Sequence, residues 1–351
     1  MTTATAAVDA VLAEHRALTR RRLAAVVGLA VLAVAAFLLD LFSGPSSLSI
    51  GDAFAALLSP EGLDPTTLVI VQNVRLPAAL TAVLVGAGLA IAGAELQTVF
   101  DNPLADGLTL GIAPAAALGA ALAIILGVSL PGIPAAWLVP ANAFVFAFGA
   151  TLALIVMARV AGGGAEVLLL LGIGMVSAFN ALIAMLQFVA SQQALQQFVF
   201  WMLGSLSGAR WGVMGPLAAA VLVLGPLAMR QSWQLTALRL GEERAASLGI
   251  NLQRLRLWSL LRVSLIIAAA VSIVGTIGFV GLVGPHIARL LVGEDHRFFL
   301  PASALTGAIV MSLAAMGAKS LLVGAVIPIG ILTALVGLPV FFALILSGRA
   351  R

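Results

Sequence analysis

Long apolar runs separated by short polar segments make up most of the sequence. Each run approaches or exceeds the roughly 20 apolar residues that a helix needs to cross the hydrocarbon core of a bilayer. The short alternating segments typical of a transmembrane β-barrel are not found. We therefore predict an all-α polytopic membrane protein with about ten transmembrane helices. The predicted spans cover residues 22–42, 74–99, 108–128, 136–159, 166–190, 211–230, 256–275, 278–292, 299–322 and 327–347.

Two stretches depart from this pattern. The eighth span, 278–292, is short and is interrupted by three glycines and Pro285, as helices that line transport pathways often are. The stretch 196–211 contains Phe200, Trp201 and Trp211, which suits an aromatic helix at the membrane interface.

Basic residues give the orientation. With the N-terminus in the cytoplasm and ten alternating spans, 15 of the 18 Lys and Arg residues fall on the cytoplasmic side, as the positive-inside rule demands. The three outside are Arg75, Arg210 and Lys319. Removing the eighth span would place the last two arginines outside, so the charges favour ten spans with both termini cytoplasmic. The predicted location is the bacterial inner membrane.

Composition excludes other classes. The chain is 62% hydrophobic and 9% charged, against about a quarter charged in soluble domains. It has no cysteine, and its three histidines lack metal-ligand spacing, so we expect neither a metal site nor a cofactor. We attribute its basic character to cytoplasmic loops rather than to nucleic-acid binding. We interpret residues 1–21 as a cytoplasmic tail before an uncleaved first helix, within one membrane domain, 1–351.

The only sizeable polar segment in the interior is 235–256. Gly241 and Gly249 bracket a predicted short helix with Glu242 and Glu243 at its N-terminal end, where the helix dipole favours anions. A second short helix is expected after Asn251. The segment is either a solvated loop or a docking element that inserts into the groove of a partner.

The chain has no energy source of its own. Its single lysine, Lys319, stands in Gly-Ala-Lys-Ser, so no phosphate-binding Gly-Lys-Ser/Thr loop exists. If the protein pumps a substrate, another subunit must bind and hydrolyse ATP, and this chain is not itself an enzyme.

Several motifs resemble one known family. The chain resembles the FecCD-type permeases of ABC importers for ferric siderophores, haem and cobalamin, in family order over roughly residues 50–347. The matching stretches are Arg75–Pro77, Gly93–Gln97, Asn102–Asp106, Phe200–Leu206, Gly241–Gly249, Gly278–His286, Asp295–Pro301 and Pro328–Thr333.

The resemblance implies a type II ABC importer permease fold, paired as a dimer with a second copy or a sister permease around a central path. Two cytoplasmic ATPase subunits would dock on the 241–249 segment, and an extracytoplasmic substrate-binding protein would dock outside. The residues that match the family's coupling positions are Gly241, Glu242, Glu243, Ala245, Leu248 and Gly249. Arg75 and Lys319 match its docking cations.

The resemblance also places a cytoplasmic gate at Asn102, Leu104, Gly163 and Gly164. There are departures from the family pattern: Ala78 and Ala315 stand where an arginine and an aspartate are frequent. The loss of that aspartate together with the Arg-to-Lys change at Lys319 suggests a retuned docking surface.

Glu95 and His286 are candidates for the translocation pathway, because charged groups inside a membrane are costly. The alternatives are that Glu95 reaches cytoplasmic water and that His286 serves helix packing. Asn102 and Asp106 are expected to cap the third span.

An iron chelate, such as a ferric siderophore, is the expected cargo. A haem, cobalamin or oxyanion importer is the alternative within the class. Alternatives from other classes are a channel or secondary transporter, which would have no use for the 241–249 segment, and a membrane scaffold, which would not need the interrupted eighth span. The sequence leaves open which chelate is carried.

Overall fold

The computed structural model describes residues 2–44, 48–59, 61–128, 131–162, 164–322 and 325–348. Over these residues the secondary structure is helical, with no strand. The elements are α1 Thr2–Phe42, α2 Ile50–Leu58, α3 Pro65–Val69, the π-helix η1 Ile70–Arg75, α4 Leu76–Val99, α5 Ile112–Leu126, the 3₁₀ turn η2 Ala135–Trp137, α6 Leu138–Val160, α7 Ala165–Val189, α8 Gln192–Met202, α9 Trp211–Arg230, α10 Ser232–Leu238, α11 Glu242–Ser247, α12 Leu252–Val274, α13 Val280–Val292, α14 His296–Ser320 and α15 Ile329–Gly348.

Each of the ten predicted spans corresponds to one helix, namely α1, α4, α5, α6, α7, α9, α12, α13, α14 and α15. Among the described residues, seven helical segments are long and apolar enough to cross a membrane, while α5, α13 and α15 supply shorter apolar helices. The prediction of an all-α polytopic protein with ten helices is confirmed.

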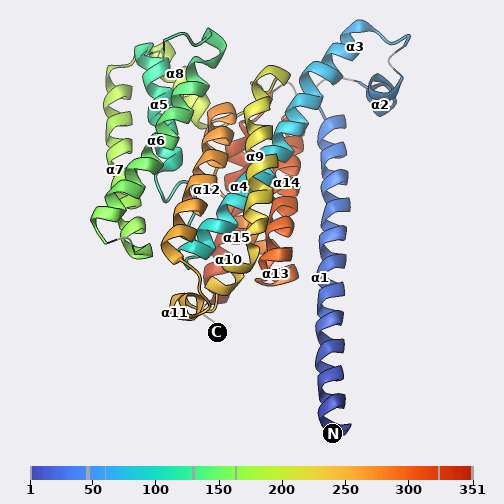
Figure 1. Ribbon diagram of the computed structural model, residues 1–351. Coiled ribbons are helices and arrows are strands. Elements are labelled where there is room, and N and C mark those ends of the chain that lie inside the picture. Colours follow the sequence, from blue (N-terminus) through green and yellow to red (C-terminus); the bar gives the residue numbers. More distant parts are fainter. Residues whose placement is uncertain are drawn as a thin grey trace.

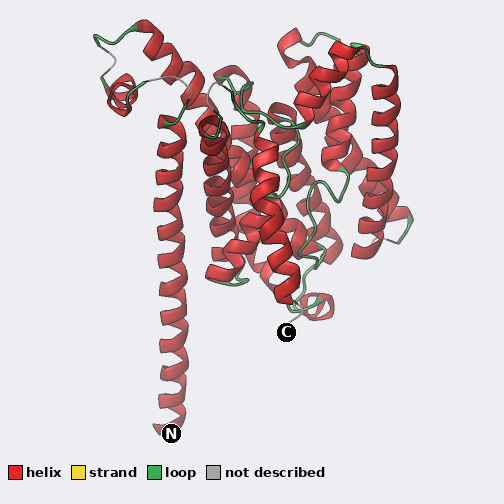
Figure 2. Cartoon of the chain, turned by 180° about the vertical axis from the view of Figure 1, so that it is seen from behind, coloured by secondary structure: helices red, strands yellow, loops and turns green. Residues whose placement is uncertain are grey.

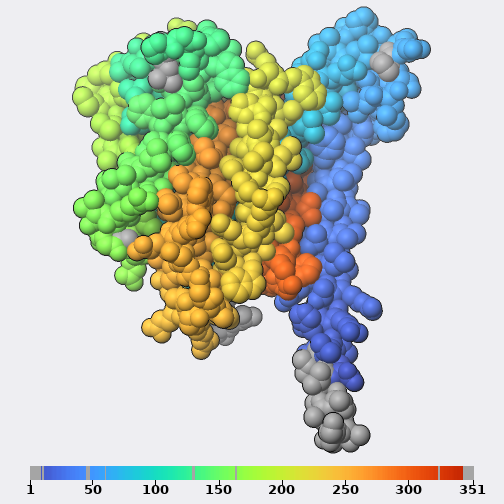
Figure 3. Space-filling view, viewed as in Figure 1, coloured from blue at the N-terminus to red at the C-terminus, as the bar shows by residue number. Residues whose placement is uncertain are grey.

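Helix α4 occupies the centre of the bundle. It packs against α14, α12, α13 and α9, while α5 to α8 form one flank and α1 lies against α14 on the other (Figures 1 and 2). In the space-filling view α1 runs along one side of the molecule, beneath α2 and α3 (Figure 3). The central helices α4 and α12 are mostly buried, whereas α1, α7 and α9 expose most of their apolar surface, as helices in contact with lipid or another chain do.

Two pairs of glycines bring the central helices close together. A Cβ on Gly93 would lie 1.8 Å from the carbonyl oxygen of Gly281, and a Cβ on Gly86 would lie 2.3 Å from that of Gly307. No side chain fits at such distances. Small residues therefore allow α4 to pack directly on the backbones of α13 and α14, where lipid supplies no hydrophobic drive for association.

The helix that ends in α4 begins earlier than predicted. Asp64 caps it by accepting hydrogen bonds from the backbone of Thr66 and Thr67, and Pro65 occupies its first turn, where a missing N–H costs nothing. The π-helical turn η1 precedes Pro77. Proline cannot donate to the preceding turn, so a local widening of the helix is expected there.

Three other boundaries differ from the prediction. Helix α1 begins at Thr2, so the segment 1–21 continues the first span as helix where it is described; its alanine-rich sequence favours helix. Helix α5 begins only at Ile112, and the expected second short helix after Asn251 is the first turn of the long helix α12. Asn251 does cap it, accepting a hydrogen bond from the backbone of Arg254 at 2.9 Å.

The bundle has two distinct ends. One carries α10 and α11, and both chain ends lie toward it; the other carries α2, α3 and α8 (Figure 1). We call them the α11 end and the α8 end. The aromatic interfacial helix expected at 196–211 corresponds to α8, where Phe198 stacks on Trp201.

Candidate functional site

A short helix, α11, projects from the α11 end between two glycines. Gly241 has φ +103° and ψ 152°, and Gly249 has φ +82°. Both conformations are unfavourable for residues with a side chain, the first most of all. No atom lies within 4 Å of a Cβ built on either residue. The backbone turn itself, rather than crowding, therefore requires glycine on both sides of α11.

The surface of α11 divides into a packed side and an exposed side. Ala245 is fully buried, whereas Leu240 and Leu248 are 56% and 53% exposed. The alanine holds α11 to the bundle, whereas the two leucines, one on each side of the helix in sequence, face outward. Glu242 forms an ion pair with Arg256 of α12, and Glu243 is exposed.

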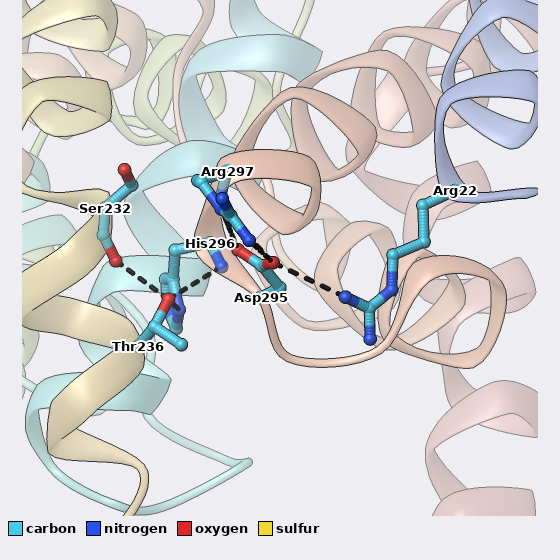
Figure 4. Close-up of polar contacts among 6 residues, drawn as sticks. All are labelled: Arg22, Ser232, Thr236, Asp295, His296 and Arg297. Carbon is cyan, nitrogen blue, oxygen red and sulfur yellow. Dashed lines mark hydrogen bonds and ion pairs between the residues drawn. The ribbon is translucent and has the colours of Figure 1, made fainter. Parts of the chain in front are cut away.

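Helix α10, which leads into α11, is fastened to the start of α14 by Thr236. The Thr236 hydroxyl accepts a hydrogen bond from the backbone N–H of His296 at 2.9 Å and lies 3.2 Å from the ring Nδ1 (Figure 4). The same hydroxyl donates to the Ser232 carbonyl at 2.8 Å. The other ring nitrogen of His296 lies 2.8 Å from the Thr98 hydroxyl of α4. The buried imidazole thus bridges α10 and α4.

Arg239, between α10 and α11, forms a second attachment. Its guanidinium donates two hydrogen bonds to Glu294, at 2.9 and 2.7 Å, and contacts Asp101 in the loop after α4. These hydrogen bonds raise the pKa of Arg239. Burial opposes ionisation of Glu294, but the hydrogen bond and charge of Arg239 outweigh it and lower its pKa. Both shifts favour the charged forms, so the pair stays ionised near neutral pH.

Asp295 completes the attachment. Its carboxylate pairs with Arg297 at 2.7 Å and with Arg22 of α1 at 3.4 Å (Figure 4). Hydrogen bonding from Arg297 lowers the pKa of Asp295. Segment 294–297, which we call the α14 junction, therefore connects α10 with α1 and α4.

Sequence reasoning did not assign a role to Thr236, Arg239 or Glu294. The signal available was the Asp295-His296-Arg297 motif, which contributed to the resemblance but received no function. The contacts that attach the junction to α1, α4 and the α10 region join residues 55 to 273 positions apart in the chain, and sequence spacing cannot reveal such pairings.

The candidate gate residues come from separate elements. Asn102 and Leu104 lie in the loop between α4 and α5, while Gly164 directly precedes α7; Gly163 lies outside the described residues. The Asn102 side chain accepts a hydrogen bond from the backbone of Leu104 at 2.9 Å. The gate assignment therefore remains a prediction.

The expected caps of the third span are also corrected. Asn102 organises its own loop, and Asp106 accepts hydrogen bonds from Leu108 and Thr109 at 3.0 and 2.9 Å. Helix α5 starts after Gly111, whose φ is +79°. Residues 108–111, which the apolar pattern assigned to the beginning of the helix, instead belong to the turn at Asp106.

Glu95 does not reach water. It is fully buried between α4 and α12, where Arg262 donates to it at 2.6 and 3.4 Å. The same guanidinium donates to Ser259 at 3.1 Å. Because its carboxylate is paired inside the bundle, the alternative that Glu95 reaches cytoplasmic water is wrong, and its pathway role stays a prediction. His286 is half-buried in α13, and its role stays a prediction.

The candidate docking cations lie at the α8 end. Arg75 and Lys319 both line a cavity of about 340 Å³, together with Ser205 and Ser207. Arg75 is only 5% exposed and donates to the Phe42 carbonyl at 3.1 Å. Contrary to a simple picture of exposed docking cations, its guanidinium lies largely beneath the chain that follows α1.

Lys319 forms an ion pair with Asp40 of α1 at 2.6 Å and donates to the carbonyl of the same residue at 2.7 Å. Asp40 is fully buried. The carboxylate missing at Ala315, one turn before Lys319, is thus supplied from another helix. This pairing was beyond sequence reasoning because 279 positions separate the two residues.

The described chain is a polytopic membrane protein: seven of its helices are long and apolar enough to cross a membrane, three more are shorter and apolar, and α11 projects between two glycines. The chain belongs to the FecCD transport family, whose model matches residues 32–347.

Several known proteins are similar to it. The hemin transport system permease protein HmuU of Yersinia pestis is 39% identical over 80% of this chain and 84% of its own length. The Fe(3+)-citrate import system permease protein YfmE of Bacillus subtilis is 37% identical over 92% and 96%. A solved ABC transporter, assigned to the metal-chelate type and in an inward-facing conformation, matches with a TM-score of 0.80 and 33% identity over 92% of this chain and 98% of that one. The chain is therefore an ABC importer permease, and permeases of this family act with ATPase subunits and a binding protein.

Proposed function

We propose that this permease moves an iron chelate, such as a ferric siderophore, inward across the bacterial inner membrane. The α11 end faces the cytoplasm, with both termini on that side, and two ATPase subunits dock on α11 and bind the ATP. A second permease chain completes the path, and a substrate-binding protein approaches the α8 end. The similarity to a ferric citrate permease over nearly the whole chain supports iron as cargo. Haem is the second candidate, because a hemin permease is also similar.

One observation carries the ATPase proposal: α11 projects from the bundle with Leu240 and Leu248 exposed, while Ala245 and the Glu242–Arg256 pair anchor it. Two exposed leucines that flank a short helix held by glycine turns suit insertion into a groove of a partner. The α14 junction then links this helix to α1 and α4. Force applied to α11 can reach the central helix through Arg239 and His296.

Arginine substitutions in and directly after α11 test the docking. Glu242→Arg places a cation beside Arg256, and Gly249→Arg forces a side chain onto a backbone with positive φ. We expect both variants to insert in the membrane, to lose co-purification with the ATPase subunit, and to lose uptake. Glu14→Arg is the matched control, because Glu14 is an exposed acid on α1. Normal uptake by the two α11 variants would refute ATPase docking at this helix.

Growth assays test the cargo separately. A strain deleted for this permease should fail to grow on a ferric siderophore as the only iron source, and should recover when the gene is restored. Growth that fails on haem but not on siderophores would replace the proposed cargo with haem and leave the docking of the ATPase intact.

A further inference from the structure

A basic groove lies between α9 and α12 at the α11 end. It has a volume of about 690 Å³, and its walls include Arg230 at the end of α9 and Arg254 in the first turn of α12. Neither guanidinium forms an ion pair within the described part of the chain. Arg262 also lines the groove, but Glu95 neutralises it from behind. No described residue that lines the groove is acidic.

The groove changes character along its length. Gln231, Gln234 and Asn251 accompany the arginines near the α11 end, whereas Leu224 and Leu265 lie farther into the bundle. Because α9 ends and α12 begins at the α11 end, the two antiparallel helices place their leucines progressively deeper in the membrane. Arg254 and Leu265 are separated by about 16 Å along α12 at 1.5 Å per residue.

Trp258 lies at the boundary between the two halves. It lines the groove one turn beyond Arg254 and is 46% exposed. Tryptophan concentrates at the level of lipid headgroups, with its ring toward the acyl chains. The N-terminal end of α12, which begins in the same wall, adds a positive potential.

We infer that this groove binds an anionic phospholipid, with its phosphate headgroup between Arg230 and Arg254 and an acyl chain along the leucines beyond Trp258. Two unneutralised arginines attract the negative headgroup. The apolar half of the groove would be of no use to a soluble anion, and it selects a lipid over free phosphate. The inference rests on the chain lying in a bilayer and does not depend on the transported substrate.

Tryptophan quenching tests this directly. The permease–ATPase complex is reconstituted in phosphatidylcholine vesicles that contain brominated phosphatidylglycerol or brominated phosphatidylcholine at equal mole fraction. The sequence has five tryptophans, so the signal of Trp258 is obtained as the difference between the wild type and Trp258→Phe. We expect brominated phosphatidylglycerol to quench this component more strongly. Equal quenching by the two lipids would overturn the proposal.

Charge variants sharpen the test. Arg230→Gln/Arg254→Gln should weaken the apparent affinity for phosphatidylglycerol roughly 30-fold, since each basic residue near a membrane surface contributes about 1 kcal/mol. Arg20→Gln/Arg21→Gln is the matched control, because these arginines are exposed on α1 at the same end. An equal loss in the control would mean that general surface charge, and not the groove, attracts the lipid.

Two further experiments, a single-residue variant and a competition with a soluble anion, identify the site and the ligand. Arg254 also lines a neighbouring groove with Arg159 and Arg256, whereas Arg230 lines only the one between α9 and α12 among the described grooves. Arg230→Gln alone should therefore weaken binding several-fold.

Millimolar glycerol 3-phosphate should not displace the brominated lipid, and displacement would indicate a soluble-anion site instead. An unchanged melting temperature of each variant in phosphatidylcholine alone shows that folding is intact.

Discussion

The two ends of the bundle hold their charges in different ways. At the α11 end, Arg239, Glu294 and Asp295 share partners across several helices, and most of these groups are half-buried or exposed. At the α8 end, Lys319 meets a single, fully buried carboxylate, Asp40. A distributed network can change partners one at a time when a helix moves. An isolated buried pair cannot be broken without leaving an unpaired charge, which suits a fixed attachment of α1 to α14.

The difference also separates two kinds of functional element. The short helix α11 is flanked by the exposed Leu240 and Leu248 and contacts the bundle through Ala245 and Glu242, so most residues of the sequence motif lie at the surface. At the α8 end, Arg75 and Lys319, the predicted docking cations, instead line a cavity whose walls include α14 and the residues directly after α1. The proposed binding-protein contact at Arg75 and Lys319 therefore requires either access to that cavity or a movement of the chain after α1.

The largest effect is expected inside the bundle, behind the α11 end. Arg262→Ala leaves Glu95 buried without its partner, which should destabilise the protein by about 3–5 kcal/mol. Glu95→Met/Arg262→Met removes both charges and should recover most of that loss. Thermal unfolding of the purified permease in detergent measures both. Equal stability of Arg262→Ala and wild type would show that the pair contributes nothing.

A somewhat smaller effect is expected at the α8 end. Lys319→Met leaves Asp40 unpaired and should cost about 3 kcal/mol, at the lower end of the range because Lys319 keeps 16% of its side chain exposed. Asp40→Asn/Lys319→Met should restore the melting temperature. The affinity of this double variant for the binding protein shows whether Lys319 contacts that protein or only pairs with Asp40. A restored protein that still binds poorly identifies Lys319 as a docking residue, and normal binding assigns it to structure alone.

The smallest effect on stability, and the most informative about coupling, is expected at the α14 junction. Thr236→Val removes the acceptor for the His296 backbone N–H and should cost about 1–2 kcal/mol. ATP hydrolysed per substrate transported should rise, because α10 is no longer fastened to α14. Thr98→Val removes the contact on the other side of the same imidazole and leaves α10 in place.

The Thr98→Val control should lose a similar free energy of unfolding. It should keep the normal amount of ATP hydrolysed per substrate transported. Equal uncoupling in both variants would mean that the position of His296, and not the α10 attachment, determines coupling. The number of ATP molecules hydrolysed per substrate transported is measured in vesicles that contain the complete transporter with its binding protein.

Much of the fold could be predicted because a bilayer imposes simple requirements. Ten apolar runs correspond to ten helices, since an unpaired backbone group in hydrocarbon is too costly for any other local structure. The helix boundaries that were predicted wrongly differ from the structure for local reasons. The Asp106 turn delays α5, and η1 joins α3 to α4 where Pro77 disturbs the helix. The glycine turns around α11 were predicted because positive φ is a property of the local chain.

The sequence by itself determined the class of protein, the number of long apolar helices and the position of the short helix α11, because hydrophobicity, charge placement and glycine turns act over short stretches of chain. Only the tertiary structure decided which charges meet. It paired Glu95 with Arg262 and Lys319 with Asp40, and it brought Thr236 to His296. It also formed the basic groove from the end of α9 and the beginning of α12. Such contacts depend on how helices pack, and packing is determined by side-chain shape along whole faces, which no local pattern records.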